Sequence, residues 1–510
     1  MEPTAWFGGG TNLTMADGGL LAGLLALMFF IGWYFGREES GTEDFFLGRG
    51  SIPVWVACLS FVATEISAMT LIGVPATAFR ENWNYAQFFI GSSAAKVAVA
   101  FLFIPAFYRY RCTTIYEFLR HRFGPASQYA ATCFFFVTRL LASGVRLMAA
   151  CLAISVLLDW HIVPVIALFT VVGMLYIGYG GIKAVVWTNV LQAVVFILAG
   201  AATVAFIVSR VEGGLPAVWS SASAAGRLDL FNLGPGLSDP AFLKKFFSDP
   251  NVILVAVLNG FFTSMSAFGT DHEMVQKLLT VETRRQSQLT ILSSILGSFV
   301  VLLIFLSVGA CLFAFYQASP ASPLPAQLDK IYPHFASTVM PAFLRGLVLS
   351  AIVMASIDSP LASLTAVFVT DIYRPLIKRD GTQAHYMLVS RLSVAVFAVL
   401  LGAIAWYLSS FDKMLWLAFK IGGVTYGSLL GVFLFGMTST RRANKSNVVA
   451  MLAMAAVNAV LLLLSEQKVI GLGWSWLVVI GTFGTWGLAW LLAPVLDGPG
   501  EAPAVLNSQA

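Results

Sequence analysis

Four polar side chains lie at the centre of a long apolar segment near the start of the chain. The apolar run extends from about residue 54 to residue 78, which is long enough to cross a bilayer as a helix. Its centre contains Thr64, Glu65, Ser67 and Thr70. A carboxylate at this depth costs about 3 kcal/mol or more unless it faces a cavity, an ion or a partner. Because a helix that unwinds here offers its carbonyl oxygens to a cation, the segment predicts a broken helix that carries part of an ion and solute site.

A second segment, residues 346–373, carries oxygen ligands in a helical arrangement. Ser356, Ser359 and Ser363 are spaced i, i+3 and i+7, which places the three hydroxyls on one face of a helix. Asp358 interrupts that face and adds a carboxylate. Hydroxyl, carbonyl and carboxylate oxygens are hard ligands, which suit Na⁺ and not a soft metal. The segment is therefore predicted to supply the other half of the site.

Cationic side chains also fall inside apolar runs, at Lys96, Arg139, Arg146 and Lys420. Arg139 and Arg146 are seven residues apart and share one helical face. This pair suits the binding of a carboxylate solute, with a structural or gating role as the alternative. Lys96 is expected to extend toward the membrane surface. Glu65 is expected to pair with one of these cations or to belong to the ion path.

The composition excludes a soluble protein. Of the 510 residues, 58% are hydrophobic and 11% are charged, with a mean hydropathy of +0.83, whereas about 25% of the residues of a soluble domain are charged. We therefore expect an all-α polytopic protein in the lipid bilayer of the cell membrane. No basic cluster with interleaved aromatic residues indicates a nucleic-acid partner. The five histidines fall in expected loops or at helix ends, and no filter motif occurs, so neither an intramembrane enzyme nor an ion channel is expected.

Thirteen apolar runs reach or approach the roughly 20 residues that a transmembrane helix needs. The short loops on one side hold sixteen Lys and Arg residues, and those on the other side hold four. Because Lys and Arg are enriched in cytoplasmic loops, we expect the N-terminus outside and the C-terminus in the cytoplasm. The runs are approximately 19–36, 54–78, 87–108, 127–158, 161–182, 184–210, 251–270, 287–317, 341–372, 385–410, 412–438, 446–465 and 472–493.

The long segment 211–250 separates two sets of spans. Each set opens on a helix with a polar centre, and in the second set Asn259-Gly260 and the hydroxyl cluster 263–266 predict a break. Broken helices at corresponding positions of two halves indicate an inverted repeat with a site at the membrane midplane. We expect an N-terminal helix and loop, a first repeat, an outer loop, a second repeat, and two C-terminal helices with a tail. Their bounds are 1–53, 54–210, 211–250, 251–438 and 439–510.

Five motifs follow one another between about residues 43 and 438. They read EDFFLGRGSIP, TTIYEFLRHRFG, YGGIKAVVWTNVLQ, GTDHEMVQKLLT and SIDSPLASLTAVFVTDIY. On these motifs the chain resembles the sodium/solute symporter family, in the sodium–glucose cotransporter group. The resemblance implies a LeuT-type fold of 5+5 inverted repeats with one additional N-terminal and two additional C-terminal helices, and Na⁺ as the coupling ion.

The resemblance also implies a Na⁺ site between the first broken helix and the eighth core helix. The carbonyl ligands of the family fall on Ala63, Ile66 and Ile352 of this chain. The paired serines of the family fall on Ala355 and Ser356. Since Ala355 has no hydroxyl, one of the family's ligands is missing here.

A second Na⁺ site, found in some members, is altered in this chain. The acid of the WTD motif that forms it is replaced by Asn189 in WTN. Asp358 and Ser359 lie beside the hydroxyl face that would complete the same site. We therefore expect the carboxylate to have moved from the helix of Asn189 to Asp358.

The positions that bind a sugar in the family are largely changed. The acid and the lysine of the sugar transporters fall on Phe89 and Ser298. Met69 or Thr70 is expected to contact the solute from the first broken helix, and Asn259 from the second. A hexose is therefore disfavoured.

The sequence thus predicts a Na⁺-coupled symporter that imports a small organic solute by alternating access. Arg139 and Arg146 favour an anionic or carboxylate-bearing solute over a plain hexose. The alternatives are a Na⁺/sugar symporter and a solute sensor with the same fold that does not transport. The sequence specifies neither the solute nor the oligomeric state.

Overall fold

The structure, a computed structural model, describes residues 14–37, 46–110, 112–177, 181–236, 238–355, 360–410 and 414–498. Almost all of the regular structure in these ranges is helical. The α-helices are α1 (Met15–Gly36), α3 (Val54–Glu65), α4 (Ala68–Arg80), α5 (Ala86–Ala98), α6 (Ile104–Tyr110), α7 (Tyr116–Arg122), α8 (Pro125–Leu158), α9 (Ile162–Ile177), α10 (Gly181–Arg210), α11 (Gly214–Ala224), α12 (Phe242–Ser248), α13 (Ile253–Thr270), α14 (His272–Leu278), α15 (Arg284–Ala318), α16 (Ile331–Thr338), α17 (Ala342–Met354), α18 (Pro360–Val367), α19 (Gln383–Leu408), α20 (Met414–Thr438), α21 (Asn444–Glu466) and α22 (Leu477–Leu496). Short 3₁₀ or π segments are η2 (Gly48–Gly50), η3 (Val99–Phe103), η4 (Leu328–Lys330), η5 (Phe368–Ile377) and η6 (Trp474–Trp476).

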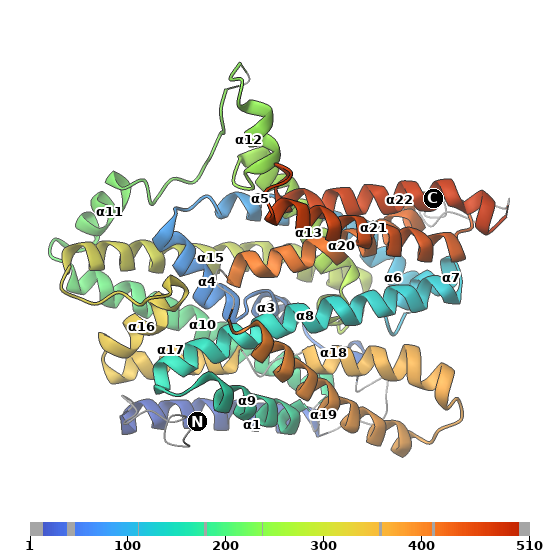
Figure 1. Ribbon diagram of the computed structural model, residues 1–510. Helices are drawn as coiled ribbons and strands as arrows, with labels where there is room; N and C mark the ends of the chain where they lie inside the picture. Colours follow the sequence, from blue (N-terminus) through green and yellow to red (C-terminus); the bar gives the residue numbers. More distant parts are fainter. Residues whose placement is uncertain are drawn as a thin grey trace.

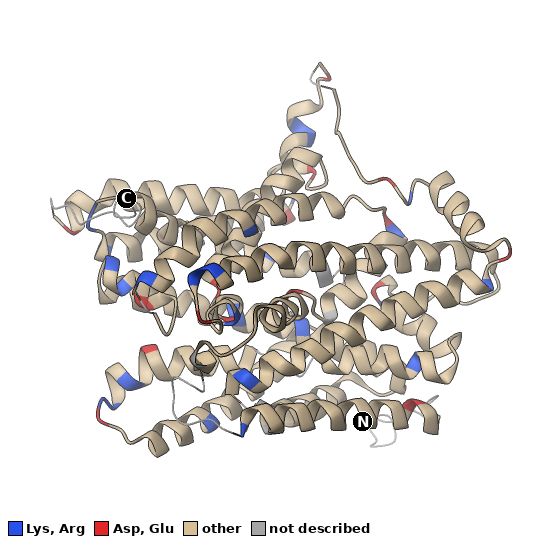
Figure 2. Ribbon diagram, turned by 180° about the vertical axis from the view of Figure 1, so that it is seen from behind, with Lys and Arg blue, Asp and Glu red and all other residues tan. Residues whose placement is uncertain are grey.

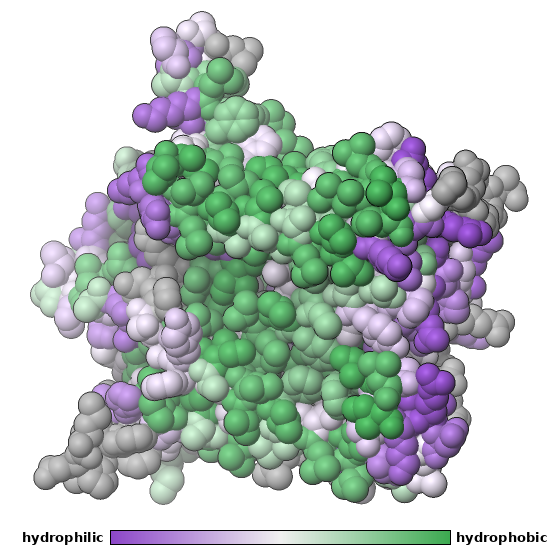
Figure 3. All heavy atoms as spheres, turned by 45° about the vertical axis from the view of Figure 1, so that its right-hand side comes forward, coloured by the Kyte–Doolittle hydropathy of each residue, from purple (hydrophilic) through white to green (hydrophobic). Residues whose placement is uncertain are grey.

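These helices confirm the all-α membrane fold. Among the described residues, ten helices are long and apolar enough to cross a bilayer, and eleven are when α3 and α4 count as one bent span. Two shorter apolar helices, α9 and α17, occupy the predicted runs 161–182 and 341–372. Figure 3 shows a broad hydrophobic face with hydrophilic residues gathered at its edges, as expected where the lateral surface contacts lipid.

The first broken helix lies between the outer helices of the bundle. The long helices run roughly along one direction (Figure 1). α1 packs against α10 and α17 on one side, and α20, α21 and α22 pack together on the other. α3 contacts α10 and α15, while α4 contacts α15 and α8. The segment between the two sets of spans, predicted as an outer loop, contains α11 and α12.

The break predicted at the centre of the second set's first helix is wrong. α13 is continuous over residues 253–270, through Asn259-Gly260 and the hydroxyl cluster 263–266. The Thr263 hydroxyl donates to Asn259 Oδ1 one turn earlier at 3.0 Å. Such local bonds satisfy polar side chains without opening the helix. The chain leaves α13 only at Asp271, whose extended backbone (φ −99°, ψ 119°) begins α14.

Helices α5 and α13 approach closely because each has a glycine at the contact. A Cβ built on Gly91 would lie 2.0 Å from the carbonyl oxygen of Val257, and one built on Gly260 would lie 2.1 Å from that of Phe88. Neither position has room for a side chain. The two backbones therefore fix the position of α5, which carries several aromatic residues of the site described below.

Replacing Gly260 with alanine is expected to destabilise the protein by about 1–3 kcal/mol, because overpacking forces the two backbones apart. Gly23→Ala in α1 is the matched control, since nothing lies within 4 Å of its added Cβ. The control is expected to be neutral or slightly stabilising, because alanine is the better helix former. Thermal unfolding of both variants in detergent tests the contact, and equal melting temperatures for the two would contradict it.

Candidate functional site

The structure contains the predicted break in the first helix. The Ile66 amide donates to the Val62 carbonyl at 2.9 Å, and the next such bond runs from Thr70 to Ser67 at 2.8 Å. The helical ladder is thus interrupted, and α3 and α4 differ in direction by 55°. The C-terminal end of α3 can offer carbonyl oxygens to a cation, while the N-terminal end of α4 is the positive end of a helix dipole.

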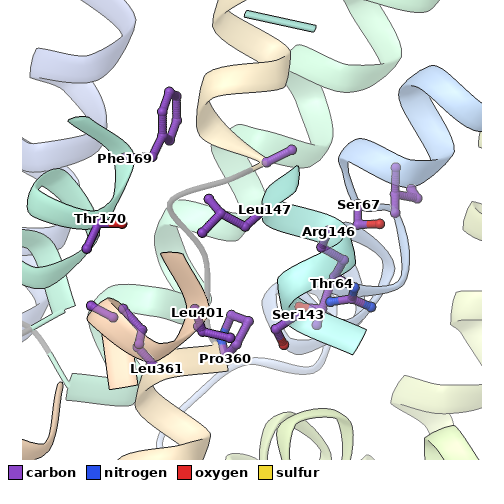
Figure 4. A pocket seen from close by; sticks show the side chains of 14 residues that line it. Thr64, Ser67, Ser143, Arg146, Leu147, Phe169, Thr170, Pro360, Leu361 and Leu401 are labelled. Carbon is purple, nitrogen blue, oxygen red and sulfur yellow. The ribbon is translucent and has the colours of Figure 1, made fainter. Parts of the chain in front are cut away.

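A small pocket of about 50 Å³, the cation pocket, lies against this break (Figure 4). Two of the predicted Na⁺ ligands, Ile66 and Ala355, line it with Thr64 and Ser67. Ile66 follows the last residue of α3 and Ala355 follows the last residue of α17. Two helix C-termini therefore meet here, and their negative dipole ends favour a cation. The other lining residues are Ser143, Arg146, Leu147, Phe169, Thr170, Gly173, Pro360, Leu361, Ala398 and Leu401.

Of the remaining predicted ligands of the first Na⁺, two lie in the helices that end at the cation pocket and one is not described. Ala63 is buried in α3 and Ile352 is buried in α17, the two helices whose ends meet at the cation pocket. Ser356 lies outside the described residues.

Asn189 binds two hydroxyls of the broken helix. It is fully buried in α10, and its side-chain amide donates to Ser60 Oγ at 3.1 Å and to Thr64 Oγ1 at 3.2 Å. Because Thr64 lines the cation pocket, Asn189 positions one of the hydroxyls of that pocket. Asp358 and Ser359, the predicted replacements for the missing acid, lie outside the described residues.

A larger cavity of about 190 Å³, the solute cavity, adjoins the cation pocket. Five of the seven predicted solute residues line it, namely Met69, Thr70, Phe89, Arg139 and Arg146. The residues that line the cavity come from the α3–α4 break, α5, α8, α13, α14 and α20. Its other lining residues are Glu65, Ser67, Tyr85, Phe88, Ser92, Ala142, Thr263, Ser264, Ala267, Phe268, Asp271, Met274, Ala418, Phe419, Gly422 and Tyr426.

The other two predicted solute residues, Asn259 and Ser298, are buried outside that lining. Asn259 Oδ1 accepts the hydrogen bond from Thr263, which does line the cavity. Ser298 of α15 accepts from Lys96 Nζ at 2.7 Å and donates to Glu65. Both residues therefore act on the cavity through a neighbour.

Glu65 pairs with Lys96, which confirms the expectation that the carboxylate has a cationic partner. Lys96 Nζ lies 2.8 Å from Glu65 Oε2 and over the rings of Phe61 and Phe268, at 5.6 and 5.2 Å from their centroids. The expectation that Lys96 extends to the membrane surface is wrong, because the residue is 1% exposed. It stands near the middle of the 25-residue span 86–110, too far from either end for its side chain to reach water.

Arg139 and Arg146 share an acidic partner that the sequence analysis missed. Arg139 Nη1 lies 3.0 Å from Asp271 Oδ2 and also contacts Glu273 Oε2, while its Nε donates to Ser143 at 3.1 Å. Arg146 Nη1 lies 3.7 Å from Glu273 Oε1. The Arg139 side chain is 2% exposed, but that of Arg146 is 26% exposed. Arg139 is thus locked in place, whereas Arg146 is held loosely.

The two acids follow directly after α13, in the motif GTDHEMVQKLLT. Asp271 caps α14 by accepting from the amide of Glu273 at 3.0 Å. Burial lowers the pKa of His272, which stands between them, to about 3, so its ring is neutral at physiological pH. In the sequence, this network of arginines and acids was indicated by the two acids, Asp271 and Glu273, that directly follow an apolar span. Lys420, the last of the four cations named from the sequence, pairs instead with Glu466 at 2.8 Å.

Comparison with known proteins gives relatives along most of the chain. The model of the sodium:solute symporter family matches residues 45–455. The sodium/sialic acid symporter SiaT of Proteus mirabilis is 28% identical over 442 residues, which cover 84% of this chain and 86% of SiaT. The sodium/sialic acid symporter NanT of Aliivibrio fischeri is 28% identical over 485 residues, which cover 92% of this chain and 91% of NanT. Sodium-coupled monocarboxylate transporter 1 of Mus musculus is 27% identical over 428 residues, which cover 82% of this chain and 68% of the mouse protein.

A solved structure has the same fold. The substrate-bound, outward-open structure of a Na⁺-coupled sialic acid symporter superposes with a TM-score of 0.83 at 24% identity, covering 96% of this chain and 100% of that one. The family match spans four fifths of the sequence and contains both halves of the site, from the α3–α4 break to α20. The chain therefore belongs to the sodium:solute symporter family.

Proposed function

We propose that this sodium-coupled symporter imports a small carboxylate-bearing solute, which binds in the solute cavity beside the break in the first helix. The observation that carries the proposal is that Arg146 faces the solute cavity with a weak ion pair. Its guanidinium group lines the cavity, and the only ion pair that it makes among the described residues is the 3.7 Å contact with Glu273. A guanidinium group binds a carboxylate through paired, charge-assisted hydrogen bonds. The positive end of the α4 dipole adds to the attraction for an anion.

The surroundings of Arg146 also favour an acid over a sugar. Aromatic rings form much of the cavity wall, and Phe88 and Phe419 lie 4.9 Å apart between ring centroids. Phe89 stands where the sugar transporters of the family have an acid. The three relatives described above are named for sialic acid or monocarboxylates, and both kinds of solute contain a carboxylate. A hexose offers no carboxylate to Arg146.

The charges around the cavity suggest why Na⁺ accompanies the solute. Three cations, Lys96, Arg139 and Arg146, stand beside three acids, Glu65, Asp271 and Glu273. A carboxylate that enters this balanced, buried group adds one negative charge, which is unfavourable unless a cation enters with it. One Na⁺ in the neighbouring pocket restores the balance. Na⁺ would therefore bind more tightly to the solute-loaded protein, and the solute to the Na⁺-loaded protein.

We place the first Na⁺ at the cation pocket, with carbonyl ligands from Ala63, Ile66 and Ile352 near Ala355 and the Ser356 hydroxyl. The meeting of two helix C-termini there supports this assignment. A second Na⁺ is proposed to bind where Asn189 orients the Ser60 and Thr64 hydroxyls. Its further ligands are Asp358 and Ser359.

The membrane orientation is proposed from charge. Lys and Arg gather toward the end of the bundle at which α22 ends (Figure 2). This supports a cytoplasmic C-terminus and an N-terminus outside. The division into an N-terminal helix, two inverted repeats, the intervening segment 211–250 and two C-terminal helices remains part of the proposal. In it, one repeat rocks against the other around the fixed site.

A thermal-shift screen in detergent tests the solute class. Sialic acid, aliphatic and aromatic monocarboxylates, amino acids and glucose are each added in NaCl and in KCl of the same ionic strength. A ligand that binds the folded state raises the melting temperature by mass action. We expect carboxylates to raise it in NaCl and not in KCl, and glucose to have no effect. A shift with glucose alone would contradict the proposed class.

A further inference from the structure

Arg146 borders both cavities of the site. It comes from the middle of α8 and is one of two residues, with Ser67, that line both the cation pocket and the solute cavity. Figure 4 shows its side chain beside Thr64 and Ser67, at the break between α3 and α4. The same guanidinium charge is therefore in reach of the Na⁺ ligands and of the solute.

The Arg146 side chain is held loosely where it stands. Its ion pair with Glu273 spans 3.7 Å, and the other oxygen of that carboxylate contacts Arg139. If Arg146 moves away, Arg139 still balances the negative charges of Asp271 and Glu273, because it contacts both carboxylates. The loss of a loose, partly exposed pair costs little. Arg146 is thus a loosely held cation that stands next to a tightly paired one.

Among the described residues that line the cation pocket, Arg146 is the one charged side chain. The pocket lining, within the described part of the chain, consists of hydroxyl, small and apolar residues together with Arg146. Polar oxygens come from Thr64, Ser67, Ser143 and Thr170. A Na⁺ bound there would face the guanidinium group across a pocket of about 50 Å³. Like charges at such a distance in a partly buried site repel strongly.

We propose that Arg146 couples the two sites by electrostatic displacement. Na⁺ in the cation pocket drives the guanidinium group into the solute cavity, where it binds the solute carboxylate. The carboxylate, once bound, holds Arg146 away from the cation pocket and so favours Na⁺. This inference rests on the proposed function, since it takes a carboxylate as the solute. It adds that the coupling is carried by one side chain, which competes with Na⁺ when no solute is bound.

The proposal predicts tighter Na⁺ binding when the charge is removed. Thermal unfolding of the full-length protein in detergent is followed against NaCl, with KCl keeping the ionic strength constant and no solute present. In Arg146→Gln the NaCl concentration at the midpoint of the stabilisation is expected to fall at least tenfold. In Arg146→Lys, which keeps the charge, it is expected to stay within about threefold of the wild type.

Two further variants keep the test decisive. Arg146→Met removes the charge but keeps an apolar stem, and it replaces Arg146→Gln if that variant does not fold. Arg210→Gln, at the exposed end of α10, controls for a change in net charge and should leave the midpoint unchanged. An unchanged or higher midpoint in the neutral variants overturns the coupling role of Arg146.

The outcome separates this inference from the proposed function. If the wild type binds carboxylates with Na⁺ but the midpoint does not fall in Arg146→Gln, only the displacement idea fails. If the midpoint falls and no carboxylate binds to the wild type, the competition between Arg146 and Na⁺ stands and the proposed solute class fails.

Discussion

Arg139→Met is expected to destabilise the protein by about 3–5 kcal/mol, the usual cost of removing one partner from a buried ion pair. The reason is the position of Asp271 and Glu273, which are 3% and 1% exposed and both contact the lost guanidinium group. Without Arg139, the two acids would lose the guanidinium group that both of them contact, while Arg146 stands 3.7 Å from Glu273. Thermal unfolding in detergent, with size-exclusion chromatography to follow the folded fraction, measures the loss.

Two comparisons show whether the loss comes from uncompensated charge. Arg146→Met removes the same group from the same helix, but it should cost about 1 kcal/mol or less because its ion pair is long and partly exposed. Adding Asp271→Asn and Glu273→Gln to Arg139→Met should recover much of the lost stability, because no charge is then left unpaired. Equal losses for Arg139→Met and Arg146→Met would contradict the distinction between a tightly held and a loosely held arginine.

Lys96→Met is expected to have the second largest effect, a loss of about 3 kcal/mol. The substitution leaves the Glu65 carboxylate at the helix break with Ser298 as its remaining hydrogen-bond partner among the pairs described above. The methionine retains the apolar stem that packs against Phe61 and Phe268. The loss should therefore come from the ammonium group and not from packing.

A double-mutant cycle with Glu65→Gln isolates this pair. The double variant Lys96→Met/Glu65→Gln is expected to be more stable than Lys96→Met, with a coupling energy of about 1–3 kcal/mol between the two sites. Thermal unfolding of the four proteins gives the value. Strict additivity of the two single changes would mean that the 2.8 Å contact contributes nothing to stability.

The first half of the site was readable from the sequence for a physical reason. Between residues 60 and 73, polar and small residues interrupt an otherwise apolar span, and a carboxylate at that depth must face a cavity, an ion or a partner. The same argument failed for α13, because hydroxyls such as Thr263 bond one turn back and leave the helix intact. Polar residues in a span thus indicate a site, but they do not by themselves indicate a break.

The acids of the site could not be predicted in the same way. Asp271 and Glu273 lie just beyond the apolar run, where charges are common, and only the fold turns them back toward α8. Arg139 and Arg146 are both intramembrane cations in sequence, yet the structure holds Arg139 tightly and Arg146 loosely. That difference depends on their places along α8, since Arg139 contacts both Asp271 and Glu273, whereas Arg146, seven residues further on, lies 3.7 Å from the other oxygen of Glu273.

Uptake into proteoliposomes tests the central claim most directly. The purified protein is reconstituted and supplied outside with a labelled carboxylate, either sialic acid or a monocarboxylate chosen by its Na⁺-dependent thermal shift, under an inward Na⁺ gradient. We predict accumulation above the external concentration, which is abolished by replacing Na⁺ with K⁺ and strongly reduced in Arg146→Gln. Accumulation that persists in K⁺, or binding of the carboxylate without any accumulation, would contradict a Na⁺-coupled carboxylate symporter.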